Sequence, residues 1–304
     1  MYRYQVRIIV RYISILSCFI REGKDGRARG RFLKLLLCGW LFRSYYIIIK
    51  NKTFNLRQKK AKKTMRVWDI HPAYLSDKSL LGEHVEIHAL YNIISGGKKG
   101  YSQHPETKRW TGHLQQLVSR HNLVIKEMLL REFKHKSPLS IPTDIKEQNF
   151  ATNLSYVDLP ARQFAILYKK YLEKNQAGRI PLPGNKTEFW AQHKYSIMAR
   201  GYQYYKEVQS FMKNSPDLPI LQAGDLISKI QYYFQFQVPE KALENTILHL
   251  WGYFKKDVNT EEKKHFFNLQ DSIEKINFLF TLAKKYQKKY LLHSTIFADF
   301  LSVN

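Results

Sequence analysis

Three stretches of the chain repeat apolar residues at the three- and four-residue spacing of an amphipathic helix. In the first stretch, residues 80–94, the repeated positions are Leu80, Ile87, Leu90, Tyr91 and Ile94. Ser76 or Asp77 can cap the start of this helix, and the pair Gly96-Gly97 can end it. We therefore expect a helix with one buried stripe.

Two further helices are expected downstream. The second stretch, residues 111–132, has Thr111 as its expected cap and one apolar face. That face consists of Leu114, Leu117, Val118, His121, Ile125 and Met128. The third stretch, residues 161–174, follows Asp158 and Pro160, and its expected buried side chains are Phe164, Leu167, Tyr168 and Tyr171. No stretch alternates apolar and polar residues as a half-buried strand does, so the sequence predicts an all-α protein.

Composition divides the chain near residue 64. Residues 1–64 hold 17 Lys or Arg and only two acids, Glu22 and Asp25, so they carry +15 of the net charge of +25. Both cysteines, Cys18 and Cys38, also lie there. The remaining 240 residues therefore have no disulfide and no cysteine-based zinc site. They have the composition of a soluble globular protein and are long enough for two domains.

The basic leader, residues 1–64, allows three interpretations. A membrane anchor would need about 20 mostly apolar residues, but Arg43 interrupts the best candidate, residues 32–49. A secretory signal would need a small-residue cleavage site after its apolar stretch, and none follows Ile49. The third interpretation is a start codon assigned too far upstream, because Met65 opens a segment that resembles the beginning of a protein. We favour the third and keep a basic or membrane-associated tail as the alternative.

Residues 98–110, between the first two predicted helices, combine four cations with two aromatic residues. The cations are Lys98, Lys99, Lys108 and Arg109, and the aromatic residues are Tyr101 and Trp110. Cations can neutralise phosphates, and aromatic rings can stack on unpaired bases at about 1–3 kcal/mol each. A solvated basic loop with Trp110 in the core explains the same composition, so composition alone leaves both interpretations open.

The first predicted helix also carries polar residues with candidate chemistry. Glu83 and Glu86 share a face away from the centre of the apolar stripe, although exposed glutamates ordinarily only aid solubility. His84 and His88 are four residues apart, as in helical zinc proteases, but those have Glu directly after the first His, where this chain has Val85. The sequence therefore predicts no metal and no other cofactor.

The segment from Met65 to about Pro183 resembles the pyrimidine-dimer DNA glycosylase family of the endonuclease V type. The motifs that carry the resemblance are Met65-Arg66-Val67-Trp68 with His71-Pro72, Leu81-Gly82-Glu83-His84-Val85-Glu86, Lys99-Gly100-Tyr101 with His104-Pro105, Arg109-Trp110, and residues 133–139 and 179–183. In this family the nucleophile is the free α-amine of the mature N-terminus, and a glutamate about twenty residues later completes the site. The resemblance therefore implies Met65 as the nucleophile and Glu86 as the catalytic carboxylate.

An α-amine and a carboxylate are suited to this glycosylase and lyase reaction. An α-amine with a pKa near 7.7–8.0 is roughly a tenth neutral at pH 7, whereas a lysine near 10.4 is almost never neutral. The neutral amine would attack the sugar C1′ and release the base, giving an imine that permits strand cleavage. Glu86 would stabilise the positive charge on the sugar and move protons, and Arg66 would clamp a phosphate. The phage-type enzymes begin with Thr and have Arg at the position of Val85, so the resemblance implies the chemistry more than the lesion.

Residues 186–304 resemble a YbgA-type helical domain of unknown function. The resemblance is carried by residues 190–195 and 205–208, by Met198-Ala199, by Asn245 with His249, by residues 252–255 and by Glu261-Glu262-Lys263. His193 and His249 form no recognisable catalytic set, and the aromatic residues Trp190, Tyr195, Trp251, Tyr253 and Phe254 are expected in the core. Residues 178–184, with Pro181 and Pro183, are the expected linker.

The sequence thus predicts two helical domains, residues 65–183 and 186–304, in a DNA-repair glycosylase with AP-lyase activity. The expected partner is double-stranded DNA, ultraviolet-damaged or abasic, and the expected location is the bacterial cytoplasm without membrane association. The expected DNA contacts come from Arg66, Lys98, Lys99, Tyr101, His104, Lys108 and Arg109. The alternatives are a DNA-binding protein without catalysis and a small-molecule enzyme centred on the C-terminal domain.

Overall fold

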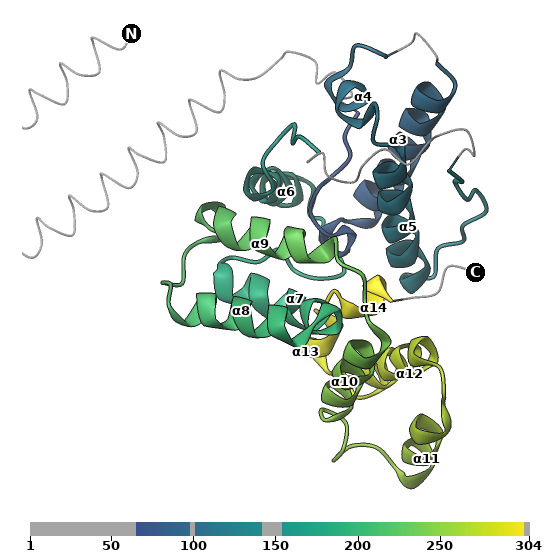
Figure 1. Cartoon of the computed structure of the whole chain (residues 1–304), viewed down its shortest axis with the longest axis vertical. Helices are drawn as coiled ribbons and strands as arrows, with labels where there is room; N and C mark the ends of the chain where they lie inside the picture. Colours follow the sequence, from purple (N-terminus) through teal and green to yellow (C-terminus); the bar gives the residue numbers. More distant parts are fainter. Residues whose placement is uncertain (1–64, 98–100, 142–153, 301–304) are drawn as a thin grey trace, which may run out of the picture. The chain divides into compact units, whose positions relative to one another are not determined.

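A computed structural model of the chain describes residues 65–97, 101–141 and 154–300 (Figure 1). The leader, residues 1–64, and the candidate DNA contacts Lys98 and Lys99 lie outside the described residues, so their interpretations stay predictions. Within the described ranges every extended regular element is a helix, and the β-structure is limited to an isolated bridge between Asn185 and Pro219. The predicted all-α class is confirmed.

The helices follow one another without a long interruption except around the undescribed segments. The first part contains the 3-10 helix η1 (Pro72–Tyr74) and the helices α3 (Asp77–Ser95), α4 (Pro105–Trp110), α5 (Leu114–Leu130) and α6 (Pro160–Lys174). The second part contains α7 (Lys186–Arg200), α8 (Tyr202–Lys213), η2 (Ile220–Gln222), α9 (Gly224–Phe234), α10 (Glu240–Trp251), α11 (Thr260–Asn268), α12 (Ser272–Lys285), α13 (Lys289–Leu292) and α14 (Ile296–Asp299).

Helix α3 begins and ends where its sequence predicts. The Ser76 side chain accepts a hydrogen bond from the Ser79 N–H, which satisfies one of the free donors of the first turn. Gly96 follows the last turn, and Gly97 adopts φ +57°, a left-handed conformation that a residue without Cβ reaches easily. The buried stripe includes Leu80, Ile87 and Leu90, so the helix predicted at residues 80–94 is confirmed.

The predicted start of the second helix is wrong. Thr111 is the C-cap of α4, and its N–H donates to the Thr107 carbonyl. The expected loop between the first two helices is therefore partly helical: His104 accepts a hydrogen bond from the Glu106 N–H, and Pro105 starts a short helix. Gly112, at φ +82°, separates α4 from α5. The predicted apolar face of α5 is buried as expected, including His121.

Helix α6 confirms the third predicted helix. Phe164, Leu167 and Tyr171 are buried. Tyr168, expected to be buried, is only partly buried, and its hydroxyl donates to the Leu182 carbonyl at 3.0 Å. The asparagine after the helix, Asn175, takes the left-handed conformation and provides the C-cap.

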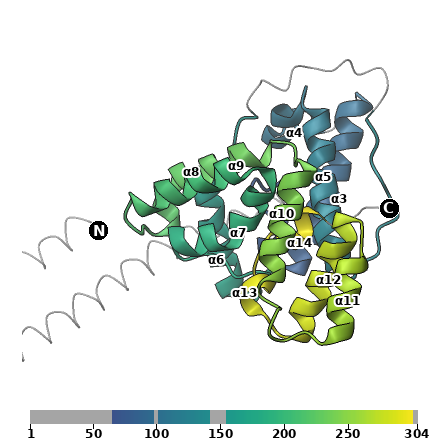
Figure 2. The ribbon, with the colours of Figure 1, turned by 60° about the horizontal axis from the view of Figure 1, so that its bottom comes forward.

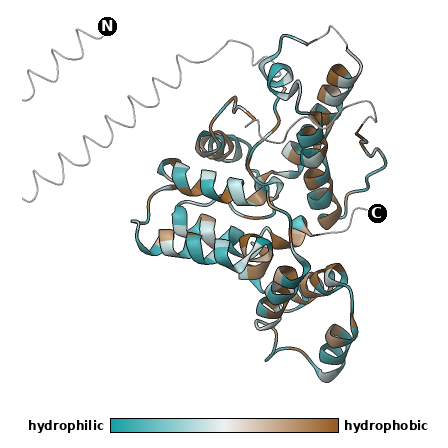
Figure 3. Cartoon of the chain, in the orientation of Figure 1, coloured by the Kyte–Doolittle hydropathy of each residue, from teal (hydrophilic) through white to brown (hydrophobic). Residues whose placement is uncertain are grey.

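The residues from Met65 onward form one compact unit with two hydrophobic cores. The first core extends from Met65 through α3, α5, α6 and α9 and includes Tyr233. The second is built mainly from α10, α12 and α14, and it also takes Leu130 from α5 and Tyr195 from α7. Helix α7 contacts α8, α9 and α10, and α14 contacts α5 (Figures 1 and 2). The hydrophobic and hydrophilic residues lie on different sides of most helices (Figure 3).

The expected linker is packed against the first hydrophobic core. A Cβ on Gly178 would lie 2.4 Å from the Tyr74 carbonyl oxygen, so only glycine permits this close approach of two backbones. Two residues later Ile180 is fully buried, and its N–H donates to the Ala73 carbonyl at 3.1 Å. The proposed division into residues 65–183 and 186–304 stays a prediction, but the connection itself contributes to the first core.

Among the described residues, no helix combines the length and the apolar character that crossing a membrane requires.

Candidate functional site

The segment that begins at Met65 is fixed to helix α3 by a buried glutamate. The Trp68 N–H donates to Glu83 Oε1 at 2.9 Å. The Met65 side chain is itself buried in the first core. The start of the segment therefore lies beside the helix that carries both candidate glutamates.

Glu83 is buried, which its sequence position did not indicate. Arg120 of α5 donates to both of its carboxylate oxygens, at 2.9 and 3.0 Å, and also to the Ile70 carbonyl at 2.9 Å. Burial raises the pKa of Glu83, and the Arg120 guanidinium opposes that shift. The prediction that Glu83 is exposed and solubilising is therefore wrong. Its carboxylate connects the segment that begins at Met65 (the N-terminal segment) with α3 and α5.

Glu86 lies about one turn further along α3 and is partly exposed. The Glu83 carboxylate, in contrast, accepts hydrogen bonds from Arg120 and from the Trp68 N–H. Of the two glutamates, Glu86 is therefore the one open to an incoming ligand.

Arg66 is engaged in an ion pair. Its Nη2 donates to Asp158 Oδ2 at 2.6 Å, and its guanidinium lies 5.1 Å from the centre of the Trp68 ring. A quarter of the Arg66 side chain stays exposed. A phosphate at this position would compete with Asp158 for the guanidinium.

The basic segment between α3 and α5 divides into exposed and buried residues. Tyr101 is 70% exposed and adopts φ +56°, and Lys108 is exposed as well. His104 is partly exposed and caps α4. Trp110 is buried at 3% exposure, so it packs in the core and is not available for stacking on a base.

Arg109 does not face the solvent. Its guanidinium forms ion pairs with Asp69 and, at 3.3 Å, with Glu106, and it lies over the Trp110 ring. Burial raises the pKa of Glu106, and the positive charge of Arg109 opposes the shift. The structure therefore assigns Arg109 a role in packing α4 against the N-terminal segment, in contrast to Lys108.

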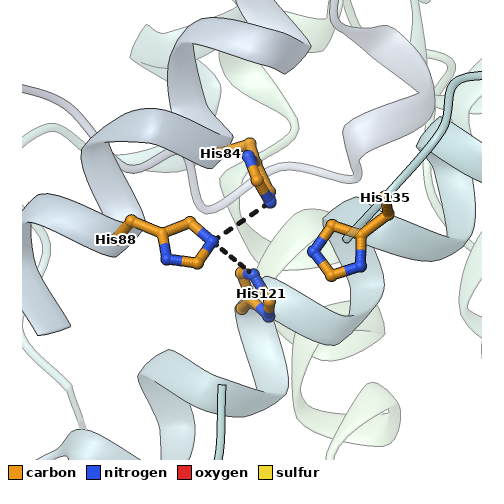
Figure 4. A group of neighbouring side chains, drawn as sticks. All are labelled: His84, His88, His121 and His135. Atoms are coloured by element: carbon orange, nitrogen blue, oxygen red, sulfur yellow. Dashed lines mark hydrogen bonds between the residues drawn. The ribbon is translucent and has the colours of Figure 1, made fainter. Parts of the chain in front are cut away.

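Four histidines that are far apart in the sequence come together beside α3. His84 and His88 lie one turn apart on α3, His121 lies on α5, and His135 follows α5 (Figure 4). The sequence indicated only the first pair. The signal for His121 was its position on the apolar face of α5, whereas nothing in the sequence pattern indicated His135.

Burial favours the uncharged form of three of these histidines, His84, His88 and His121. It lowers the pKa of both His84 and His121 to about 4, and neighbouring histidines add to the effect. The pKa of His88 is lowered for the same reasons. At neutral pH these imidazoles each have one free lone pair.

The histidines of the second part of the chain have separate surroundings. His193 is buried, its Nε2 lies 2.9 Å from the Tyr74 hydroxyl, and its Nδ1 lies 3.3 Å from Thr295 Oγ1. His249 is exposed on α10.

Of the five aromatic residues expected in the core of this part, four are buried or partly buried, namely Trp190, Tyr195, Trp251 and Phe254. Tyr253 is 39% exposed.

Comparison with protein families gives two matches in the order that the sequence predicts. Residues 65–141 match the pyrimidine dimer DNA glycosylase family. Residues 194–300 match a family described as a protein of unknown function (DUF1722). We refer to these as the glycosylase region and the DUF1722 region. Neither the curated proteins nor the solved structures gave a match.

The glycosylase region includes the N-terminal segment, α3, α4 and α5, and therefore both candidate glutamates. This match indicates DNA glycosylase activity on pyrimidine dimers and hence binding to DNA. Helix α6 and the first half of α7 lie between the two matched regions.

Proposed function

We propose that the chain is a pyrimidine-dimer DNA glycosylase with AP-lyase activity, in which the free α-amine of Met65 is the nucleophile and Glu86 the catalytic carboxylate. The observation that carries the proposal is the hydrogen bond between the Trp68 N–H and Glu83. It holds the N-terminal segment against the helix that also carries Glu86.

The short distances that these segments can span support the pairing of Met65 with Glu86. Three residues of extended chain, from Trp68 back to Met65, span at most about 10 Å. One helical turn, from Glu83 towards Glu86, advances about 5.4 Å. The match to the glycosylase family also begins at Met65, which suits a mature chain that starts there.

In the first step the neutral Met65 amine attacks C1′ of the damaged nucleotide. A bond forms between the nitrogen and C1′, the glycosidic bond breaks, and the base leaves with its electron pair and accepts a proton. The nitrogen then loses one proton, the C1′–O4′ bond breaks as O4′ takes up a proton, and a protonated imine links Met65 to the opened sugar. Glu86 stabilises the positive charge that develops on the sugar and nitrogen, and it moves the proton that opens the ring.

In the second step the imine acidifies the C2′ position. Removal of a C2′ proton expels the 3′ phosphate and cleaves the strand, and water then releases the product from Met65. A peptide amide at residue 65 could not begin this sequence, because its lone pair is delocalised into the carbonyl. The active form therefore begins at Met65.

The exposed side of α4 and the preceding turn form the proposed DNA-binding surface. Lys108 contacts a phosphate, and Tyr101 and His104 lie on the same segment, where an exposed aromatic ring can stack on a base. The proposal also assigns phosphate contacts to Lys98 and Lys99, which lie outside the described residues. Arg66 clamps a phosphate by exchanging Asp158 for it.

Borohydride trapping tests the proposal directly. The form that begins at Met65 is mixed with an abasic duplex and reduced, and the complex is digested to locate the linked residue. We expect a covalent complex attached through the nitrogen of Met65, because reduction converts an imine to a stable amine. DNA binding without any trapped complex would instead identify a DNA-binding protein without lyase chemistry.

A further inference from the structure

The four histidines His84, His88, His121 and His135 converge from three separate segments of the fold. Their potential ligand atoms all lie within 4.8 Å of one another. Figure 4 shows the four rings directed towards a common centre. Two of them share one face of α3 because they are four residues apart.

The spacing of the nitrogens matches a tetrahedral metal site. His88 Nε2 lies 3.2 Å from His84 Nε2 and 3.1 Å from His121 Nε2. A tetrahedron with zinc–nitrogen bonds of about 2.0–2.1 Å has edges of about 3.3–3.4 Å. The widest separation in the group, up to 4.8 Å, closes to this length with ring movement of about an ångström.

Hydrogen bonding alone does not satisfy these rings. His88 Nε2 has three neighbours, namely His84, His121 and the Ser137 hydroxyl at 3.4 Å. A neutral imidazole nitrogen has either one proton or one lone pair, so it cannot bond well to all three. In addition, His135 Nε2 is buried and has no hydrogen-bond partner in the part of the chain that the structure describes.

We propose that these four histidines bind one divalent transition-metal ion of the zinc type. An ion at the centre would accept one lone pair from each ring and remove the conflict at His88. The group consists of imidazoles alone. Imidazole suits zinc, copper, nickel and iron, whereas calcium and magnesium prefer oxygen ligands.

The site is structural and separate from the proposed catalytic glutamate. At 100° per residue, His84 and His88 each lie about 160° around α3 from Glu86. Four protein ligands also fill a tetrahedral zinc site, which leaves no position for a reacting water. The ion would therefore join α3 and α5 to the segment after α5, which also contacts α3 through Ser137 and His88 and through a hydrogen bond from the Tyr91 hydroxyl to the Ser140 carbonyl.

A titration with zinc alone tests the site without reference to DNA chemistry. The full chain, without a polyhistidine tag and with Cys18→Ser and Cys38→Ser so that no thiol competes, is stripped with a chelator and titrated with Zn²⁺. We expect one tightly bound equivalent per chain. With Co²⁺ in place of Zn²⁺, we expect the intense visible absorption of a tetrahedral site. Absence of a stoichiometric binding event would overturn the proposal.

Single substitutions locate the binding. His88→Ala and His135→Ala, both at partly exposed positions, should each weaken Zn²⁺ affinity by at least about tenfold. His249→Ala, at an exposed position on α10, is the matched control and should bind as the parent does. Circular dichroism without metal verifies that each variant folds, and Zn²⁺ should raise the Tm of the parent much more than that of His88→Ala. Equal affinity and equal Tm shifts in all variants would show that the ion, if bound, lies elsewhere, and would overturn the assignment.

Discussion

His71 Nε2 lies 3.1 Å from Oδ1 of Asp299, a carboxylate 228 residues further along the chain. His71 belongs to the glycosylase region and Asp299 to the DUF1722 region. Lys126 of α5 also donates to the Asp299 carbonyl at 2.9 Å, and Arg200 of α7 lies 3.8 Å from the Asp299 carboxylate. The two matched regions therefore share a buried polar contact.

The charge of Asp299 is stabilised by these neighbours. Burial by itself raises the pKa of this carboxyl, but the hydrogen bond with His71, the electrostatic interaction with that ring and the positive charge of Arg200 outweigh it, so the pKa lies below its usual range. An ionised Asp299 is thus part of the folded state at neutral pH.

Replacement of Glu86 tests its catalytic role. Glu86→Gln should reduce strand cleavage by about 10²–10³-fold, because the amide cannot stabilise the positive charge of the transition state. Folding and DNA affinity should stay as in the parent, since the side chain is partly exposed. Single-turnover cleavage of an abasic duplex measures the effect, with Glu173→Gln, an exposed glutamate on α6, as the control. Full cleavage by Glu86→Gln would remove this residue from the mechanism.

Glu83→Gln should act on stability instead. Its carboxylate is fully buried and pairs with Arg120, so its neutralisation leaves a guanidinium without its charge partner. We expect a loss of about 3 kcal/mol in the free energy of unfolding. Urea unfolding measures this, and Glu173→Gln should change the value by less than about 0.5 kcal/mol. A normal urea midpoint for Glu83→Gln would mean that the Arg120 pair contributes nothing to folding.

Lys108 and Arg109 are neighbours in sequence but should respond differently. Lys108→Gln should lower the slope of log affinity against log salt by about one unit, since it removes one phosphate contact and leaves the fold intact. Arg109→Gln should mainly destabilise the protein, because its guanidinium is buried between Asp69 and Glu106. Fluorescence anisotropy at several salt concentrations and urea unfolding separate the two effects. An unchanged salt slope for Lys108→Gln would show that α4 is only a solvated surface.

Helix positions were easier to predict than the roles of individual polar residues. The stripes of α3, α5 and α6 follow from apolar periodicity, because each helix buries one face. Helix α4 has only six residues, too few for a periodic pattern, so its local signals were the N-cap His104 and the proline at its first position, Pro105.

In the candidate site, too, the sequence did not predict the surroundings of individual polar residues. Glu83 and Glu86 look alike in the sequence, and their different burial depends on Arg120, which lies 37 residues after Glu83. Similarly, the burial of Arg109 depends on Asp69, 40 residues before it. Long-range partners of this kind leave no periodic pattern in the sequence.

Acid should destabilise the protein partly through His193. Burial, with a smaller electrostatic effect from the neighbouring His71 ring, lowers the pKa of His193 to about 3. The unfolded chain, with a histidine pKa near 6.5, then binds about one more proton than the folded chain between pH 6.5 and 3. Stability from this group is complete above pH 6.5 and falls by about 1.4 kcal/mol per pH unit below it.

His193→Asn should therefore flatten the dependence of unfolding free energy on pH by about 1.4 kcal/mol per unit near pH 5. The groups around His193, namely His71, Asp299, Arg200 and Tyr74, are kept. Measurements in chelator avoid any effect of metal on the other histidines, and His249→Asn, which is exposed, should keep the parent slope. Equal slopes for His193→Asn and the parent would contradict a proton-free His193 in the folded state.

The start of the chain decides whether an amine is available. The 304-residue form should give no trapped complex on abasic or ultraviolet-irradiated duplexes, whereas the form beginning at Met65 should give one. The long form could still bind DNA more tightly through the +15 charge of residues 1–64, so binding alone does not distinguish the two. Intact mass measured after the assay verifies that the long form was not processed. Equal trapping by both forms would overturn the role of the Met65 amine.

Arg179 has a consequence for how such a gene can be rearranged by recombination. It lies in neither matched region, yet its guanidinium donates to Glu127 at 2.8 and 3.0 Å and to the Leu292 carbonyl at 2.7 Å. A crossover that replaced only the DUF1722 region would change the surface that Arg179 contacts at Leu292. A crossover that removed residue 179 would leave Arg131 as the ion-pair partner of the buried Glu127. The glycosylase region, the connection that holds Arg179 and the DUF1722 region are therefore coupled through one side chain, and we expect recombination between them to yield a less stable protein.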